Sequence, residues 1–275
     1  MRLFVFGLGY AASHIVARLS DARVVATGRE GDVAFEDGER VRFEIANATH
    51  ILSSVPPLGT DDPVLGAYRG EIEQSGAWLG YLSSTGVYGD TGGAWVDECA
   101  PVGAGRRGAR AAADATWLAL GARVFRLPGI YGPGRSPLDR IRDGEARRID
   151  VPGQVFSRVH VEDIARGVVA GFDAPAGAYN LADDMPAPQS EVVAFGCRLL
   201  GLPVPPLVPL AEARLSPAAL AFYAENRRVA NGKARRVLGW RPLYPDYRAG
   251  LRALNAVTSP TPASSAPAAA SHDQR

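Results

Sequence analysis

The first twelve residues place the strongest constraint on the fold of this chain. An apolar stretch, Arg2–Phe6, runs directly into Gly7-Leu8-Gly9-Tyr10-Ala11-Ala12 at the start of a helical segment. In a strand-turn-helix unit, Gly7 makes the tight turn, Gly9 lets a pyrophosphate approach the backbone, and Ala12 lets the helix pack on the strand. The helix N-terminus then faces the phosphates. The segment therefore predicts a dinucleotide site, the alternative being a turn whose small residues serve packing alone.

The end of the next apolar segment bears on which dinucleotide is preferred. This segment, Val24–Arg29, lies about 20 residues after the glycines, where NAD-selective folds place an acid for the ribose 2′-hydroxyl. Arg29 stands there instead, and a guanidinium can pair with a 2′-phosphate. We therefore predict NADP(H) as cofactor. Glu30 and Asp32 follow closely enough to reach a ribose, which keeps NAD as the alternative.

Composition narrows the class of partner. The chain has 275 residues and a net charge of +1, with no basic run and no apolar stretch of membrane-spanning length. We expect a small-molecule substrate rather than nucleic acid or a membrane. The first strand begins at residue 2, which predicts no leader and a cytoplasmic location. Cys99 and Cys197 lie far apart and show neither metal-ligand nor disulfide spacing, so no metal site is expected.

Strand-length apolar runs alternate with helical segments along the first half of the chain. This pattern predicts an α/β fold, a Rossmann-type doubly wound parallel sheet with a small C-terminal substrate lobe. Expected strands are 2–6, 23–27, 50–54, 78–83 and 122–127, and expected helices are 10–20, 61–75, 108–120 and 162–172. The short polar segment 30–48 indicates that the usual third strand and its helix are reduced or missing.

The remaining segments divide the chain. Residues 1–175 are expected to form the nucleotide-binding domain, with 130–158 contributing to the lobe, and 176–257 to form mainly the substrate lobe. A strand near 177–182 and a helix near 188–200 are expected either to return to that lobe or to bridge to it. Helices near 216–224, 231–238 and 246–256 are expected to complete the lobe. The Ser-, Pro- and Ala-rich stretch 258–275 is expected to be a disordered tail.

Five segments together resemble the extended short-chain dehydrogenase/reductases, the group that includes nucleotide-sugar epimerases and dehydratases. The resemblance runs from residue 1 to about 256 and is carried by Gly7-x-Gly9-x-x-Ala12, Leu82–Asp90, Arg126–Gly134, Val159–Ala165 and Tyr179–Asp183. It implies cofactor contacts by Gly7, Gly9, Tyr10, Ala12, Arg29, Ser54, Ser83, Pro128 and Ile130. A homodimer is common among such proteins and is therefore a candidate state.

The chain departs from this family at the catalytic pair. Hydride chemistry in the family uses Ser or Thr with Tyr-x-x-x-Lys, in which the lysine lowers the pKa of the tyrosine. Ser84 holds the hydroxyl position, but Arg106 stands where the tyrosine belongs and Arg110 where the lysine belongs. The only lysine, Lys233, lies in the C-terminal part of the chain and cannot restore the pair. Arginine is a poor acid or base, although it can clamp an anion or hold a ribose.

Other side chains are candidates for the missing roles. Tyr131 lies in the loop that approaches the nicotinamide in the family, so we consider it the stand-in phenol, slightly ahead of Tyr88. His160 is expected to be structural. Nucleotide-sugar enzymes of the group place an arginine four residues before this histidine to grip a diphosphate, and here Phe156 occupies that position. The candidate anion contacts are Arg135, Arg147, Arg148 and Arg158.

Two functions of different classes follow from these residues. The first is an atypical oxidoreductase or epimerase/dehydratase-like enzyme acting on a small carbonyl, alcohol or sugar-like substrate. In this enzyme Ser84 would position the substrate oxygen, while Arg106 or Arg110 would contribute charge. The second is a catalytically inactive NADP(H)-binding redox sensor that lost its chemistry with the Tyr and Lys.

Overall fold

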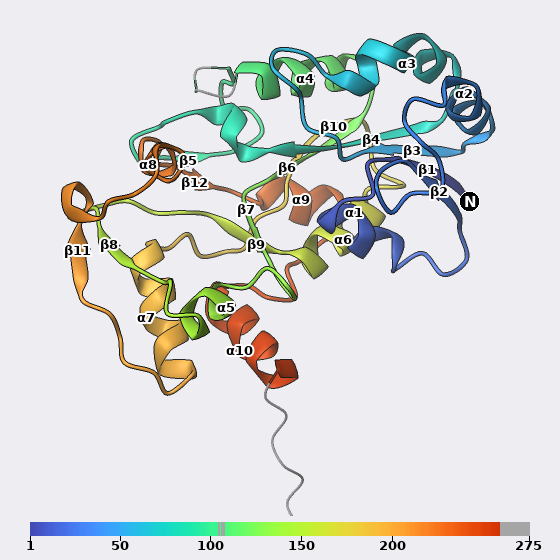
Figure 1. Cartoon of the computed structure of the whole chain (residues 1–275). Helices are drawn as coiled ribbons and strands as arrows, with labels where there is room; N and C mark the ends of the chain where they lie inside the picture. The colour runs from blue at the N-terminus through green and yellow to red at the C-terminus, as the bar shows by residue number, and fades with distance from the viewer. Residues whose placement is uncertain (104, 106–107, 259–275) are drawn as a thin grey trace, which may run out of the picture.

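Six parallel strands form the centre of the molecule. The computed structural model in Figure 1 describes residues 1–103, 105 and 108–258. All neighbouring strands of the central sheet pair in parallel, in the order β10 (Gly177–Asn180), β6 (Arg123–Leu127), β4 (Trp78–Ser84), β3 (His50–Ser53), β1 (Arg2–Phe6) and β2 (Arg23–Ala26). The predicted α/β class is therefore confirmed, and the expected strands are present with ends shifted by one residue at most.

Helices cover both faces of this sheet. Figure 1 shows one face beneath α2 (Gly38–Asn47), α3 (Pro63–Gln74) and α4 (Gly108–Ala119), and the other against α1 (Tyr10–Val16), α6 (Val161–Ala170) and α9 (Gly232–Val237). Each face has its own apolar core: Phe4, Phe6 and Trp117 lie in one, whereas Leu3 and Val5 lie in the other. The alternation along β1 is that of a strand buried on both sides.

Local signals explain where α3 begins and how it is held. The Asp62 carboxylate accepts hydrogen bonds from the backbone N–H groups of Val64 and Leu65, and Pro63 occupies the first helical turn. The other Asp62 oxygen accepts a 2.8 Å hydrogen bond from the Trp117 indole of α4. One residue thus caps α3 and ties it to the neighbouring helix.

The structure of segment 30–48 differs in part from the prediction. The third strand, expected to be reduced or missing, is reduced to an isolated bridge between Thr27 and Val33. The helix, however, is present as α2 with ten residues. Asp37 caps it, and Val41 and Ile45 bury one stripe against the sheet. These two apolar residues, four apart, suffice to dock a helix whose other positions are largely polar.

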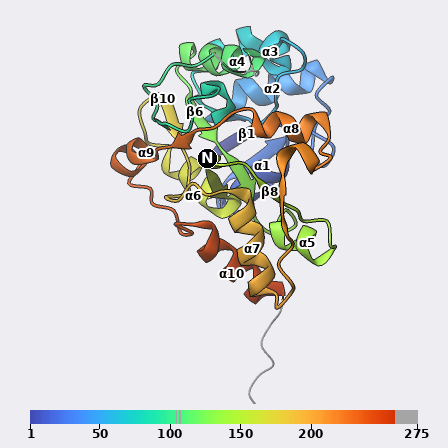
Figure 2. The same cartoon turned by 90° about the vertical axis from the view of Figure 1, so that its left-hand side faces the viewer.

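A smaller lobe follows the central sheet. Its apolar core joins α5 (Pro137–Arg142), α7 (Gln189–Leu199) and α10 (Tyr247–Thr258). Short parallel ladders join β7 (Gly129–Tyr131) to β9 (Arg158–His160), β8 (Arg148–Asp150) to β11 (Leu207–Pro209), and β5 (Trp95–Val96) to β12 (Arg228–Val229). The short α8 (Pro217–Tyr223) lies beside β5 and β12 in Figure 1, and Figure 2 shows α5, α7 and α10 below the sheet.

Two elements assigned mainly to this lobe belong to the larger domain instead. β10, expected to enter or bridge to the lobe, is the edge strand of the central sheet, where Ala178 pairs with Val124. α9 contacts β10, and Trp240 after it lies in the core below the sheet. The boundary at residue 175 therefore does not mark the end of the larger domain. No helix within the described ranges is long and apolar enough to cross a membrane. The stretch 259–275 lies outside the described residues.

Candidate functional site

A cavity of about 1190 Å³ opens where the parallel strands end. Its walls include Gly9 after β1, Ser54 after β3, Ser84 at the end of β4 and Pro128 after β6, and its far side belongs to the lobe. The strand order reverses at β1, whose two neighbours are β2 and β3. In open parallel sheets, ligands bind at the carboxyl ends of the strands beside such a reversal.

The glycine turn has the shape expected of a pyrophosphate site. Gly7 has φ +82°, and a Cβ there would lie 2.9 Å from the Val55 side chain, so only glycine fits without strain. The Ser54 hydroxyl donates to the carbonyl of Gly7 and holds the turn against β3. A Cβ on Gly9 would instead meet nothing within 4 Å, and Gly9 lines the cavity. The backbone is therefore open to a ligand at Gly9, while the fully buried Ala12 packs α1 onto the sheet.

Two further predicted cofactor residues lie nearby. Tyr10 lines the cavity and donates a 3.0 Å hydrogen bond to the Pro133 carbonyl, and Ile130 lines the same wall. Arg29 is exposed after β2 and is not among the lining residues. The neighbouring acid, Asp32, accepts a 3.0 Å hydrogen bond from the Ala26 N–H of β2. Arg29 is thus exposed at this strand end, whereas Asp32 bonds back to the sheet.

Ser84 lies at the cavity wall, and its hydroxyl proton makes no hydrogen bond to a described residue. Its Oγ accepts a 3.1 Å hydrogen bond from the Gly86 N–H at the start of a short 3₁₀ turn, Thr85–Tyr88. Within the described part of the chain no acceptor bonds to the Ser84 hydroxyl, and the side chain is half-buried. A hydroxyl fixed as an acceptor in this way can donate to a substrate oxygen.

Ser83, by contrast, serves a buried ionic network. Its hydroxyl donates a 2.7 Å hydrogen bond to Asp114, whose carboxylate also accepts from the Arg126 Nε and Nη2 at 3.0 and 2.7 Å. Arg126 donates in addition to the Tyr88 hydroxyl, which donates to Asn180. Burial raises the pKa of Tyr88 to about 12, and Tyr88 does not line the cavity. Ser83 contributes to the cavity wall, but its hydroxyl is committed to α4.

Tyr131 does not lie where the expected catalytic role requires. It is buried in the apolar core of the lobe, its ring centroid lies 5.2 Å from that of His160, and burial raises its pKa far above the usual value. Ile130, one residue earlier on β7, lines the cavity. Alternation along the strand thus directs Tyr131 away from the cavity. His160 caps α6 by accepting from the Glu162 N–H, the structural role expected of it.

The positions of the missing pair fall on α4 and just before it. Arg110 lines the cavity from the first turn of α4. Arg106 lies outside the described residues. No group of three or more His, Cys, Asp or Glu side chains is placed to hold a metal ion within the described ranges. The cavity therefore offers a hydroxyl at Ser84 and a positive charge at Arg110.

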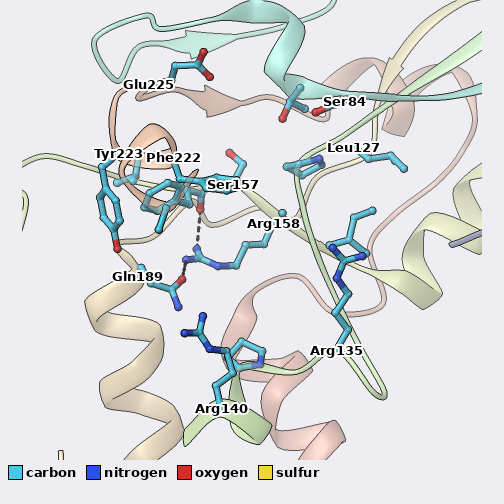
Figure 3. Close-up of a pocket in the computed structure, with 18 of the residues that line it drawn as sticks. Ser84, Leu127, Arg135, Arg140, Ser157, Arg158, Gln189, Phe222, Tyr223 and Glu225 are labelled. Carbon is cyan, nitrogen blue, oxygen red and sulfur yellow. Dashed lines mark hydrogen bonds between the residues drawn. The ribbon is translucent and has the colours of Figure 1, made fainter. Parts of the chain in front are cut away.

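The lobe supplies the most charged part of the cavity. Seven arginines and two glutamates line it as a whole, in a chain of net charge +1. Figure 3 shows Arg158 near the centre of the cavity, with Arg135 and Arg140 to the right and below and Phe222 and Tyr223 at the upper left. The expected anion contacts Arg135, Arg147 and Arg158 line the cavity, whereas Arg148 donates to the carbonyls of Ser190 and Pro205. The sequence did not indicate Gln189, Phe222, Tyr223, Glu225 or Arg227, which lie in segments without a recognisable motif.

Comparison with known proteins agrees with this architecture. A functionally unknown conserved protein from Silicibacter pomeroyi is 40% identical in sequence and superimposes with a TM-score of 0.83 over 93% of this chain and 98% of that one. A human epimerase family protein, SDR39U1, solved with NADPH, is 17% identical with a TM-score of 0.72 over 92% of this chain and 99% of that one. A UDP-glucose 4-epimerase from Thermotoga maritima is 17% identical with a TM-score of 0.73 over 92% and 97%.

The chain therefore has the fold of the extended short-chain dehydrogenase/reductases, as the resemblance in the sequence implied. A curated relative, a 3-diazoavenalumate denitrifying reductase from a Streptomyces species, is 33% identical over 147 residues, or 48% of this chain. The match spans 46% of that reductase, about half its length. No family model matches the chain.

The first turn of α4 brings Arg110 to the cavity. One turn later, Asp114 anchors the helix to Arg126 of β6. This helix therefore contributes a cation to the cavity wall and is itself held to the sheet by a buried ion pair.

Proposed function

We propose that the chain is an NADP(H)-dependent oxidoreductase, and specifically a reductase, that acts on a small molecule in the cavity. The observation that carries the proposal is the continuity of that cavity, which joins Gly9 and Tyr10 to Ser84 and to the arginines of the lobe. A dinucleotide laid along the glycine turn would end beside Ser84, as strand order and turn geometry imply. The human relative in the same fold was solved with NADPH, which supports a nicotinamide cofactor.

The residues of the cofactor end fit the phosphates of such a cofactor. Gly9 leaves its backbone open, and Ser54 fixes the turn through the Gly7 carbonyl. Arg29 is the exposed cation at the end of β2, while Asp32 accepts a hydrogen bond from that strand, so a 2′-phosphate has a partner. The bound nicotinamide supplies the hydride.

The chain's own side chains then act on the substrate oxygen. Ser84 donates a hydrogen bond to it, and Arg110 stabilises negative charge that develops near the start of α4. An arginine does not deprotonate an alcohol. Hydride addition to a carbonyl carbon leaves an alkoxide, which takes up a proton to become the alcohol, and in this proposal solvent water in the open cavity supplies that proton. The denitrifying reductase that matches half of this chain supports the same direction.

Cofactor preference is tested by titrating the purified protein with NADPH, NADP⁺, NADH and NAD⁺ and following bound-nicotinamide fluorescence or heat of binding. Arg29→Ala should weaken NADPH binding roughly 10- to 150-fold and leave NADH unchanged, since a charge-assisted hydrogen bond contributes about 1.5–3 kcal/mol. The matched control is Arg23→Ala, an exposed arginine at the opposite end of β2. Equal affinity of the unmodified protein for NADPH and NADH would contradict the preference.

Turnover is tested by screening carbonyl substrates for loss of NADPH absorbance. Ser84→Ala should lower kcat by about 10- to 100-fold without changing NADPH affinity, because a positioned donor to a developing charge is lost. Ser84→Thr, which keeps a hydroxyl, should retain much of the rate. Tight NADPH binding without turnover on any substrate would favour the alternative function, a redox sensor, which the loss of the catalytic pair also accommodates.

A further inference from the structure

Arg158 is the one arginine of the cavity wall that is itself buried. It begins β9 and is 7% exposed. Its Nη1 donates to the carbonyls of Phe156 and Ala187 at 2.8 and 3.0 Å, and its Nη2 donates to the Gln189 Oε1 at 2.9 Å. Figure 3 shows this guanidinium held between β9 and the start of α7, facing the cavity. These contacts fix its orientation before any ligand arrives.

The guanidinium retains two donors that nothing in the described chain uses. An arginine side chain has five N–H groups, and three are committed to the carbonyls and to Gln189. The Nε–H and one Nη2 hydrogen remain. Two neighbouring N–H groups of one guanidinium match the two oxygens of a carboxylate.

The charge of Arg158 also lacks a protein partner. No carboxylate lies within ion-pair distance of it among the described residues. Asp183 acts on Arg158 electrostatically without an ion-pair contact, and burial raises the pKa of Asp183 and lowers that of Arg158, so it disfavours the charged form of each. Burying a cation without a countercharge is costly, and an anion entering from the cavity would remove that cost.

The surface around this cation is aromatic. The Phe156 ring lies with its centroid 6.0 Å from the Arg158 guanidinium and meets the Tyr223 ring edge-on at 5.5 Å. Phe222 of α8 lines the same cavity although it is 54% exposed to solvent. Aromatic rings at the wall of a cavity give a ligand an apolar surface to pack against.

We propose that the substrate is an organic acid with an aromatic body, whose carboxylate binds Arg158 and whose ring packs against Phe222 and Tyr223. This inference rests on the proposed reductase function and names the substrate class for that site. Phe156 stands where nucleotide-sugar enzymes carry their diphosphate-gripping arginine, which disfavours a nucleoside diphosphate. The exposed Arg135 and Arg140 at the rim attract the anion rather than define its shape.

Binding of simple probes tests the substrate class without a known substrate. The probes are 3-phenylpropionate, its neutral isostere 3-phenylpropionamide, phenyl phosphate and UDP-glucose, each titrated by calorimetry with and without NADPH. We expect 3-phenylpropionate to bind at least about tenfold more tightly than the amide, because a buried charge pair is formed with only one of them. Equal binding of acid and amide, tighter binding of phenyl phosphate or UDP-glucose, or binding of no probe would each overturn the proposal.

Substitutions in the cavity wall test whether Arg158 causes the preference for the acid probe. Arg158→Lys keeps the charge but loses the paired donors, and it should reduce 3-phenylpropionate affinity by about tenfold or more. The matched control, Arg198→Ala, removes an exposed arginine of α7 that does not line the cavity and should change affinity by less than about threefold. If Arg158→Lys does not fold, Phe222→Ala, an exposed position, takes its place and should weaken the acid and amide probes equally. An unchanged affinity in Phe222→Ala would contradict the aromatic wall.

The NADPH titration separates this inference from the function on which it rests. Probe binding in the absence of NADPH, combined with failure of NADPH to bind, would refute the reductase and leave the carboxylate site standing. NADPH binding without any acid preference would refute the carboxylate site alone.

Discussion

Replacing Asp114 should test how α4 is anchored beneath the site. The carboxylate is fully buried and accepts three hydrogen bonds, one from Ser83 and two from Arg126. Arg126 is itself only 2% exposed. In Asp114→Ala the guanidinium stays buried with no carboxylate partner, and its remaining contact is the 3.0 Å hydrogen bond to the Tyr88 hydroxyl.

The expected loss follows from breaking a buried pair on one side only. Such changes cost about 3–5 kcal/mol, far more than the pair contributes relative to a well-packed apolar replacement. For a chain of this size, each kcal/mol lowers Tm by about 2–4 °C, so Asp114→Ala should unfold roughly 6–20 °C earlier. The double variant Asp114→Ala/Arg126→Met should recover part of this loss, because it removes the unpaired charge.

Urea unfolding followed by tryptophan fluorescence measures the effect, because Trp117 lies on α4 itself. Asp150→Ala, an exposed aspartate of β8, is the matched control and should stay within about 0.5 kcal/mol of the unmodified protein. If Asp114→Ala costs less than about 1 kcal/mol, the reasoning that this pair anchors α4 is refuted.

Two other predictions concern the cofactor turn and a buried acid. Gly9→Val should weaken NADPH binding at least about tenfold while leaving Tm nearly unchanged, since the new side chain fills only the space a pyrophosphate needs; unchanged binding would place the cofactor elsewhere. Burial raises the pKa of Asp183 to about 8, so the folded protein holds a proton that the unfolded chain releases near an ordinary aspartate pKa of about 4. The free energy of unfolding should therefore fall by up to about 1.4 kcal/mol per pH unit as the pH rises from about 4 to about 8. In Asp183→Asn this slope should be absent from urea titrations at several pH values, and its persistence would mean that another group is responsible.

Local patterns predicted the parts of the fold that depend on neighbouring residues. The turn at Gly7 and Gly9 needs only a strand, two glycines and a helix in sequence, and all three are visible in the first twelve residues. The same reasoning failed for α2, where Val41 and Ile45 are the only strongly apolar positions buried against the sheet. A stripe that short is hard to distinguish from a polar loop without knowing what it packs against.

Elements that pair over long distances could not be placed in this way. The apolar run of β10 fits either the lobe or the sheet, and its pairing with β6, about 55 residues earlier, decides between them. The direction of the Tyr131 side chain could not be predicted from the local sequence either. Its sequence position beside Ile130 was informative, but the face that each presents follows from the register of β7 on β9.

The site shows which of its features were open to sequence reasoning. Arg158 was recognisable as a candidate anion contact, yet its burial and its two committed carbonyl partners depend on β9 meeting the segment around Ala187. Gln189 and Phe222 carry no motif and enter the cavity only because α7 and α8 fold over it. Sequence motifs therefore predicted the part of the cavity at the strand ends, whereas the part formed by the lobe became visible only in the structure.

The exchange of the catalytic pair and the charge of the lobe support one interpretation of the chemistry. Ser84 and Arg110 at the cavity wall are suited to stabilising negative charge, and an arginine is a poor acid or base. The lobe adds further arginines and an aromatic wall, so the cavity as a whole favours an anion with an apolar body. In the proposed reaction, hydride adds to a carbonyl carbon of such a substrate, Ser84 and Arg110 stabilise the charge that develops on its oxygen, and solvent supplies the proton that completes the alcohol. The arginines of the lobe would hold the carboxylate of the same substrate, so the two ends of the cavity have separate roles in the proposal.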